Sequence, residues 1–185
     1  MCETLHFVDA CTEAHFSAMS HIHAMGWHAA YQGAVPAEYL AREVTDERWT
    51  PIFRKNYRLG RYHGLLLFRG DTPVCCGNYG PARGPEEMKN YLVSFPAGEI
   101  EGCGEIVSFY THPVETSKGY GSLLMEEILR RLKAEFRSCY VFVLRENSGA
   151  RRFYERHGFS WDGASIDIPF PPDQICVDLR YYRDL

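Results

Sequence analysis

The chain has 185 residues, a length that fits one domain with a sizeable hydrophobic core, and its formal net charge is −4. This charge gives no electrostatic footprint for nucleic acid or an anionic membrane, and no run approaches the ~20 apolar residues that a membrane span requires. The seven cysteines form no CxxC pair and follow no secretory leader, so we expect reduced thiols in a cytoplasmic protein.

The first part of the chain reads as one strand followed by three helices. Residues 5–8 have the composition of a short strand, and apolar side chains three and four apart predict a helix over residues 12–30. A glycine ends this helix, a second helical piece follows over residues 36–40, and a third is expected over residues 45–59.

The histidines of the first predicted helix come closest to the sequence spacing of a metal-binding motif. His21, His23 and His28 lie close in sequence, but residues two apart on a helix do not share a face. We therefore expect no metal.

Two strands and a long loop follow the helices. Residues 62–68 and 72–79 are strand-like, and the turn Arg69-Gly70-Asp71 between them predicts a hairpin. Residues 80–104 are rich in glycine and proline and form the longest predicted loop, interrupted by a short apolar piece at residues 91–95. Long loops inside compact domains are often binding elements.

A strand, a glycine loop and a helix come next. Residues 105–111 are rich in β-branched and aromatic side chains, and residues 122–132 repeat leucine and isoleucine at close to a helical period. The first turn of a helix leaves N–H groups without partners at the positive end of its dipole. Because Gly119 and Gly121 lack a Cβ, an anion can reach these groups, and Lys118 adds a positive charge. Taken alone, the loop also fits a turn that needs two glycines for its geometry.

The last part of the chain contains a buried strand, a short helix and two final strands. Residues 139–144 are almost continuously apolar, which is typical of a central strand. A helix is predicted over residues 150–156, and strands over residues 159–162 and 175–182, joined by a proline-containing loop. These elements predict one domain over residues 1–185, with a mixed α/β sheet and one crossover helix.

Two nucleotide-binding folds can be set aside. A dinucleotide-binding fold needs GxGxxG and an acidic residue after the next strand, and this chain has GxG only. A phosphate-loop nucleotidase needs GxxxxGK[ST], which is absent from the sequence.

Two motifs make the chain resemble the GNAT N-acetyltransferases, of the bacterial small-molecule type, over essentially its whole length. One is a strand ending in Pro113 followed by Gly119-x-Gly121, which is similar to the family's pyrophosphate loop [Q/R]xxGx[G/A]. The other resembles the family's N…A…FYEKxGF segment and comprises Asn147, Ala150, Phe153, Tyr154, Glu155, Gly158 and Phe159. The family's Gln or Arg is replaced by Thr116, so we expect pyrophosphate binding to depend more on backbone N–H groups.

The resemblance implies a single-domain GNAT fold: a mostly antiparallel sheet of about six to seven strands, flanked by helices, with a parallel pair splayed at its centre. It also implies acetyl-CoA as co-substrate, with no metal. The implied cofactor-binding residues are Phe109, Tyr110, Thr111, Thr116, Ser117, Lys118, Gly119, Tyr120, Gly121, Ser122, Asn147 and Tyr154.

The same resemblance implies direct attack by an amine on the thioester, with three roles for the protein. Tyr154 matches the family tyrosine that protonates the leaving thiolate, Glu105 lies where several members keep a general base, and the backbone N–H of Tyr110 would meet the oxyanion. Structural alternatives stay open: core packing for Tyr154, a solvated strand end for Glu105 and helix capping for Asn147.

The implied acceptor is the primary amine of a small molecule or peptide. We expect no nucleic acid and no membrane partner for the protein, and a homodimer stays possible. Trp27 and Tyr31, in a helix that resembles the early helices of the family, and Arg83, in the long loop, are expected to line its pocket. Two alternatives are a non-catalytic acyl-CoA-binding sensor of the same fold, and an α/β interaction protein whose glycines serve only the turn.

Overall fold

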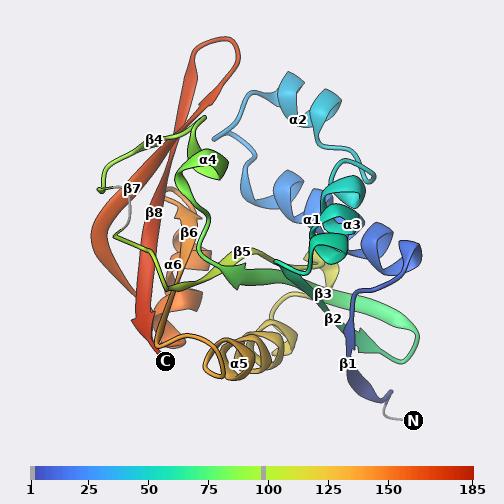
Figure 1. The fold of residues 1–185 in the computed structure, drawn as a ribbon. Coiled ribbons are helices and arrows are strands. Elements are labelled where there is room, and N and C mark those ends of the chain that lie inside the picture. The colour runs from blue at the N-terminus through green and yellow to red at the C-terminus, as the bar shows by residue number, and fades with distance from the viewer. Residues whose placement is uncertain (1–2, 97–98) are drawn as a thin grey trace.

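One mostly antiparallel sheet of eight strands carries the other elements in the computed structural model, which describes residues 3–96 and 99–185 (Figure 1). The strand order is β1-β2-β3-β5-β6-β8-β7-β4. The strands are β1 (Leu5–Asp9), β2 (His63–Arg69), β3 (Thr72–Pro81), β4 (Leu92–Val93), β5 (Gly104–Thr111), β6 (Ser138–Leu144), β7 (Ser160–Phe170) and β8 (Gln174–Asp184). The count exceeds the expected six to seven because the long loop contributes the two-residue strand β4.

Helices cover both faces of the sheet. They are α1 (Glu13–Ala30), α2 (Ala37–Glu43), α3 (Thr50–Leu59), α4 (Pro85–Met88), α5 (Tyr120–Leu132) and α6 (Ser148–Arg156), with a 3₁₀ turn at Pro113–Glu115. Successive side chains of a strand point to opposite faces, so Leu66 of β2 packs against α1, whereas Leu65 and Leu67 pack in the cluster around α5. Figure 1 shows α1, α2 and α3 grouped on one side and α5 on the other. Among the described helices, none is long and apolar enough to cross a bilayer.

The predicted N-terminal elements are confirmed, with one shifted boundary. Thr12 caps α1, because its hydroxyl accepts a hydrogen bond from the N–H of His15 at 3.3 Å. The predicted hairpin is also present, with Arg69 opposite Thr72. The third helix begins at Thr50 instead of residue 45, since a proline in its first turn favours helix initiation there.

The final strands are longer than predicted. β7 runs through Pro169 to Phe170, although the sequence suggested a loop after residue 162. Proline is tolerated at this point because, within the described residues, β7 has β4 as its outer partner only at Ile166 and Asp167. A missing N–H beyond these two positions breaks no ladder hydrogen bond on the outer edge.

β5 and β6 are the parallel pair, and they separate soon after they meet. Their register covers three positions, from Gly104 opposite Cys139 to Ile106 opposite Val141. Beyond these positions the two strands, both fully described, have no pairing to each other, which confirms the predicted splayed pair. The resulting gap lies at the centre of the sheet, between its two halves.

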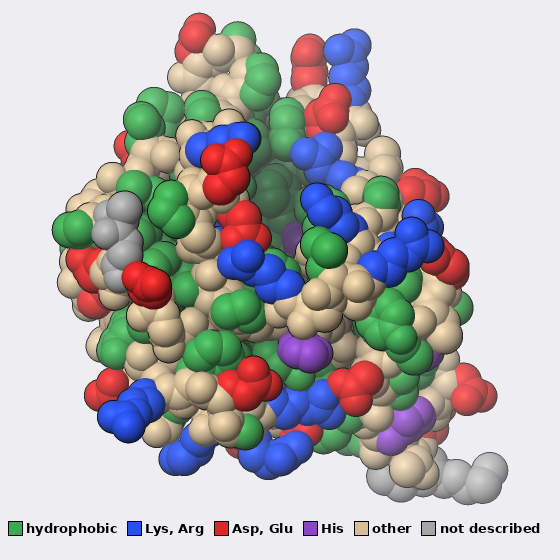
Figure 2. All heavy atoms as spheres, viewed as in Figure 1, with side chains coloured by type: hydrophobic (Ala, Val, Ile, Leu, Met, Phe, Trp, Pro, Cys, Tyr) green, Lys and Arg blue, Asp and Glu red, His purple; other side chains and the backbone are tan. Residues whose placement is uncertain are grey.

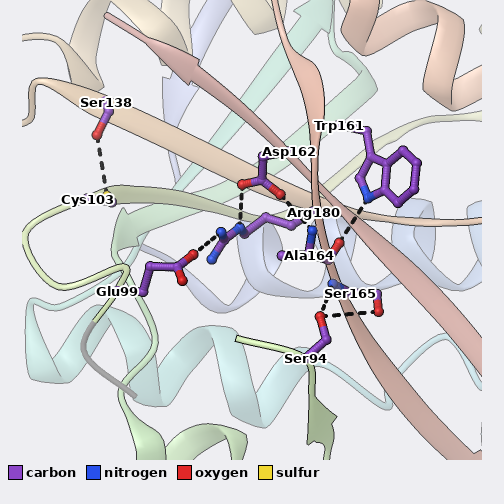
Figure 3. Close-up of polar contacts among 9 residues, drawn as sticks. All are labelled: Ser94, Glu99, Cys103, Ser138, Trp161, Asp162, Ala164, Ser165 and Arg180. Atoms are coloured by element: carbon purple, nitrogen blue, oxygen red, sulfur yellow. Dashed lines mark hydrogen bonds and ion pairs between the residues drawn. The ribbon is translucent and has the colours of Figure 1, made fainter. Parts of the chain in front are cut away.

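The long loop crosses the sheet as a strap, by which we mean residues 82–96. The backbone N–H of Ser94 donates to the carbonyl of Ser165 at 3.0 Å, and the N–H of Ser165 donates to the Ser94 hydroxyl at 2.7 Å. The guanidinium of Arg180 lies 4.5 Å from the centroid of the Phe95 ring. It also pairs with Asp162 at 2.7 Å and with Glu99 (Figure 3). These contacts attach the end of the strap to β7 and β8.

Candidate active site

The glycine loop presents bare backbone at the start of α5. Ser117 and Gly119 have φ values of 63° and 85°, in the left-handed region, and Gly119 caps the helix without a side-chain hydrogen bond. No backbone N–H of residues 117–122 has an acceptor within the described part of the chain. A Cβ on Gly121 would lie 3.1 Å from the Thr111 hydroxyl and 3.5 Å from the Phe153 ring. The loop therefore has the free N–H groups that an anion requires.

Two polar side chains of this loop, those of Thr116 and Lys118, bond to neighbouring residues of the chain. Thr116 donates its hydroxyl to the carbonyl of Pro113 at 2.9 Å, and Lys118 pairs with Glu115 at 2.9 Å. Glu115 offsets the charge of Lys118, so the attraction for an anion depends mainly on the backbone. The effect of Thr116 on pyrophosphate binding stays a prediction.

A cavity of about 400 Å³ begins where β5 and β6 separate and extends to α1, α3 and the strap. Figure 2 shows a deep hollow with apolar walls and charged side chains around its mouth. Of the residues predicted for the site, the cavity brings together Trp27, Tyr31, Arg83, Phe109, Tyr110, Asn147 and Tyr154. The glycine loop lies next to this cavity, because Phe153, which faces Gly121, is adjacent to Tyr154 in α6.

Asn147 and Tyr154 lie at the part of the cavity bounded by α6. Asn147 caps α6 by accepting a hydrogen bond from the N–H of Ala150 at 3.0 Å, and it also lines the cavity. Tyr154 is only 6% exposed and its ring packs edge-on against Phe153 and Phe159. Burial, and then the charge of Asp178, raise the pKa of Tyr154 above its ordinary value. Its phenol therefore keeps its proton at neutral pH.

Glu105 lies behind the cavity wall and is fully buried. Its Oε1 accepts from Nε of Arg83 at 2.8 Å and from Nη2 at 2.7 Å. Its Oε2 accepts from the backbone N–H of Arg83 and from the hydroxyl of Tyr140, each at 2.9 Å. Both carboxylate oxygens are thus saturated with donors, unlike those of a solvated strand end. This geometry makes Glu105 the residue that holds Arg83 in place.

Successive backbone N–H groups of β5 point alternately toward β3 and toward the gap between β5 and β6. The N–H of His112 donates to the carbonyl of Val74 on β3, and N–H groups two residues apart in a strand point the same way. The N–H of Tyr110 is therefore directed toward β3, not into the gap. Those of Phe109 and Thr111 point toward the gap, which corrects the position expected for an oxyanion donor.

The ring of Tyr110 lies directly against the backbone of α1. A Cβ on Gly26 would lie 2.2 Å from Cδ1 of Tyr110, and the ring of His23 is 4.4 Å from that of Tyr110. Glycine is needed at this position because no side chain fits between the helix and the ring.

We expect Gly26→Ala to lower the free energy of unfolding by about 1–3 kcal/mol, since the Tyr110 ring must move to admit a methyl group. Denaturant unfolding measures the effect. Gly149→Ala is the matched control, because its Cβ would meet its nearest neighbour at an ordinary 3.6 Å. A Gly26→Ala protein as stable as the control would contradict the packing described here.

The opposite part of the cavity, bounded by α1 and α3, is aromatic. Trp27 stacks on Tyr31 at 4.3 Å between ring centroids, and His23 stacks on Trp49 at 3.9 Å. Burial, assisted by the charge of Arg48, lowers the pKa of His23 to about 3. His23 is therefore neutral at physiological pH and contributes a ring instead of a charge.

Asp178 of β8 also lines the cavity, and it was missed in the sequence. It is 6% exposed, and its Oδ1 has no hydrogen-bond partner among the residues that the structure describes. Burial raises the pKa of Asp178 to about 7, with Arg83 lowering it and Glu146 raising it further. One signal was available, because aspartate is depleted inside strands. In an alternating strand, however, such a residue ordinarily faces solvent.

A comparison with protein-family models assigns the chain to one family. A sequence model described as the acetyltransferase (GNAT) family matches residues 27–159. A search of curated proteins gives no significant match.

Solved structures share the fold at low sequence identity. PaiA N-acetyltransferase from Thermoplasma acidophilum, in complex with coenzyme A, has a TM-score of 0.72 at 14% identity, covering 98% of this chain and 99% of its own. YncA from Salmonella typhimurium, solved with acetyl-CoA, has a TM-score of 0.68 at 17% identity, covering 100% and 95%. A ribosomal-protein-alanine N-acetyltransferase from Brucella melitensis has a TM-score of 0.69 at 19% identity, covering 97% and 99%.

Proposed function

This chain belongs to the acetyltransferase (GNAT) family, and from that premise we propose that it transfers an acetyl group from acetyl-CoA to the primary amine of a small molecule or peptide. The observation that carries the proposal is the cavity between β5 and β6, which combines a buried neutral phenol with an unpaired carboxylate. An acid and a base in one enclosed site are the two groups that acetylation of an amine requires.

Acetyl-CoA fits the residues at the α5 end of the site. The free N–H groups of residues 117–122 suit its pyrophosphate, and the missing Cβ of Gly121 lets α5 pack closely against Thr111 and Phe153. Two of the structural neighbours were solved with coenzyme A or acetyl-CoA, which supports this assignment. When bound, acetyl-CoA would supply an activated thioester for attack by the acceptor.

Three groups of the protein would have separate roles in the reaction. Phe109 or Thr111 donates a backbone N–H to the oxyanion of the tetrahedral intermediate. Tyr154 donates its phenolic proton to the thiolate as the C–S bond breaks, since its raised pKa keeps that proton available. We propose that Glu105, saturated by Arg83 and Tyr140, positions Arg83 and takes no proton from the amine.

The cellular setting is part of the same proposal. The cysteines of the described residues, six in all, are free thiols, and four of them are buried. Unpaired cysteines are usual in reducing compartments, which supports a cytoplasmic location.

We expect acetyl-CoA at about 100 times its Kd to raise the melting temperature by roughly 5–10 °C, because binding to the folded state alone stabilises it by about 2.7 kcal/mol. With a panel of primary amines, CoA should then be released in proportion to the acetylated product. CoA is best measured by chromatography, since the exposed thiol of Cys11 would react with a thiol reagent. Absence of thermal stabilisation at saturating acetyl-CoA would contradict the proposal, and stabilisation without turnover of any amine would indicate a sensor.

A further inference from the structure

The charges on the cavity wall leave one carboxylate without a counter-ion. The charged side chains that line the described cavity are Arg83, Glu87 and Asp178. Arg83 is neutralised by Glu105 at 2.7 Å, and Glu87 is neutralised by Arg61 at 2.7 Å. Asp178 has no ion pair within the described residues. When Asp178 is ionised, above its pKa of about 7, the cavity therefore attracts a cation and repels a second carboxylate.

The unpaired carboxylate is itself deeply buried and faces the reacting part of the site. Its neighbours belong to several elements packed around the cavity. The titratable and charged groups that act on it or feel its charge are Tyr31 at the end of α1, Tyr110 of β5, Tyr154 of α6, Arg83 of the strap, Glu146 after β6 and Cys176 of its own strand. A buried carboxylate oxygen without a donor is costly, and an ammonium group supplies the missing donors.

Aromatic rings form much of the wall of the cavity that Asp178 also lines. Trp27 and Tyr31 lie parallel, and Trp49 approaches Trp27 at 5.5 Å between centroids. Stacked rings of this kind bind flat apolar groups, and their faces also favour a nearby cation. The indole N–H of Trp27 is buried without an acceptor in the described structure, so a neutral polar group on the ligand can also be accommodated.

We infer that the acceptor is a primary amine carried on an aromatic body that bears no carboxylate, with its ammonium group bound by Asp178 and its ring held by Trp27, Tyr31 and Trp49. This inference rests on the acetyl transfer proposed above and narrows its acceptor. Asp178 also accepts the proton that the amine must lose: one N–H bond of the ammonium breaks, one O–H bond forms on the carboxylate, and the nitrogen lone pair becomes free to attack.

Three amines of matched structure test the acceptor class. 2-Phenylethylamine carries the ring and the amine, phenylalanine adds a carboxylate, and propylamine lacks the ring. We expect kcat/KM for 2-phenylethylamine to exceed that of each of the other two by about 10- to 100-fold. Equal or better turnover of phenylalanine or propylamine would overturn the inference. If none of the three reacts while other amines do, the inference fails and acetyl transfer stands. If no amine reacts and acetyl-CoA gives no thermal stabilisation, the proposed function itself fails.

The Asp178→Asn variant tests the role of the carboxylate. It should lower kcat/KM for 2-phenylethylamine by about 100-fold or more and retain stabilisation by acetyl-CoA. Since the pKa of Asp178 is about 7, the wild-type kcat/KM should rise with pH through that value, and the rise should disappear in the variant. Asn is isosteric and removes an unpaired buried charge, so the variant should fold. Asp173→Asn, an exposed change in the same hairpin, is the control. If the Asp178→Asn variant kept the kcat/KM and the pH profile of the wild type, Asp178 would not be the group that accepts the proton of the amine.

Discussion

Replacing Tyr154 by phenylalanine should lower kcat by about 10²- to 10⁴-fold, the usual contribution of a positioned acid, and leave acetyl-CoA binding unchanged. The ring is held by Phe153 and Phe159, and phenylalanine keeps these contacts. The substitution removes only the hydroxyl, so we expect the variant to fold. Steady-state kinetics measures the loss of turnover, and thermal stabilisation by acetyl-CoA measures whether binding is retained.

Tyr181 is a matched control for this variant. Its ring centroid lies 6.5 Å from that of Tyr154, but its hydroxyl bonds to Nε of Arg151 at 2.9 Å and to Glu155 at 3.0 Å. Tyr181→Phe should therefore cost stability, through these lost hydrogen bonds, and little turnover. A Tyr154→Phe enzyme within threefold of the wild-type kcat would remove Tyr154 from the mechanism. Loss of stabilisation by acetyl-CoA would instead make it a binding residue.

Glu105→Gln should lower the free energy of unfolding by about 3–5 kcal/mol, because it leaves the guanidinium of Arg83 buried without its counter-ion. The Arg83 side chain is 18% exposed and the Glu105 side chain is fully buried, so solvent screens the pair weakly. For a chain of this length, the loss corresponds to roughly 10 °C in melting temperature. Denaturant unfolding at constant pH measures it.

A double variant separates the lost charge pair from other effects of the substitution. Glu105→Leu combined with Arg83→Met removes both charges, and most of the stability should return because no ion is left unpaired. The same experiment tests the role first expected for Glu105. If Glu105→Gln were as stable as the wild type but lowered kcat by 100-fold or more, Glu105 would be the general base after all.

Local patterns in the sequence predicted those parts of the molecule that depend on neighbours in the chain. The glycine loop before α5 and the Asn147 cap of α6 are such features, because a helix terminus has specific backbone requirements within a few residues. The hairpin between β2 and β3 was predicted for the same reason, from the turn Arg69-Gly70-Asp71. The extension of β7 through Pro169 was not, since tolerance of proline there depends on a distant edge strand.

Asp178 shows why the rest of the site could not be predicted. Asp178 and Arg180 lie two residues apart in β8 and so share one face of the strand. The alternation of polar and apolar residues along β8 therefore predicts that both side chains face solvent. Both are buried, because the protein covers that face: the strap reaches Arg180, and the rings of α1 enclose Asp178. The segments that bury Asp178 and Arg180 lie about eighty or more residues earlier in the chain, so the sequence around these two residues does not indicate their burial.

The strap and the glycine loop come from different segments of the chain. The strap contributes Arg83, Glu87 and Tyr91 to the cavity, whereas the glycine loop follows β5 and contributes none of its residues to that wall. We therefore expect substitutions in residues 82–96 to change which acceptor is recognised without altering the proposed pyrophosphate site. Acceptor recognition and cofactor binding thus depend on different segments of the chain, and the first can diverge between lineages while the second is retained.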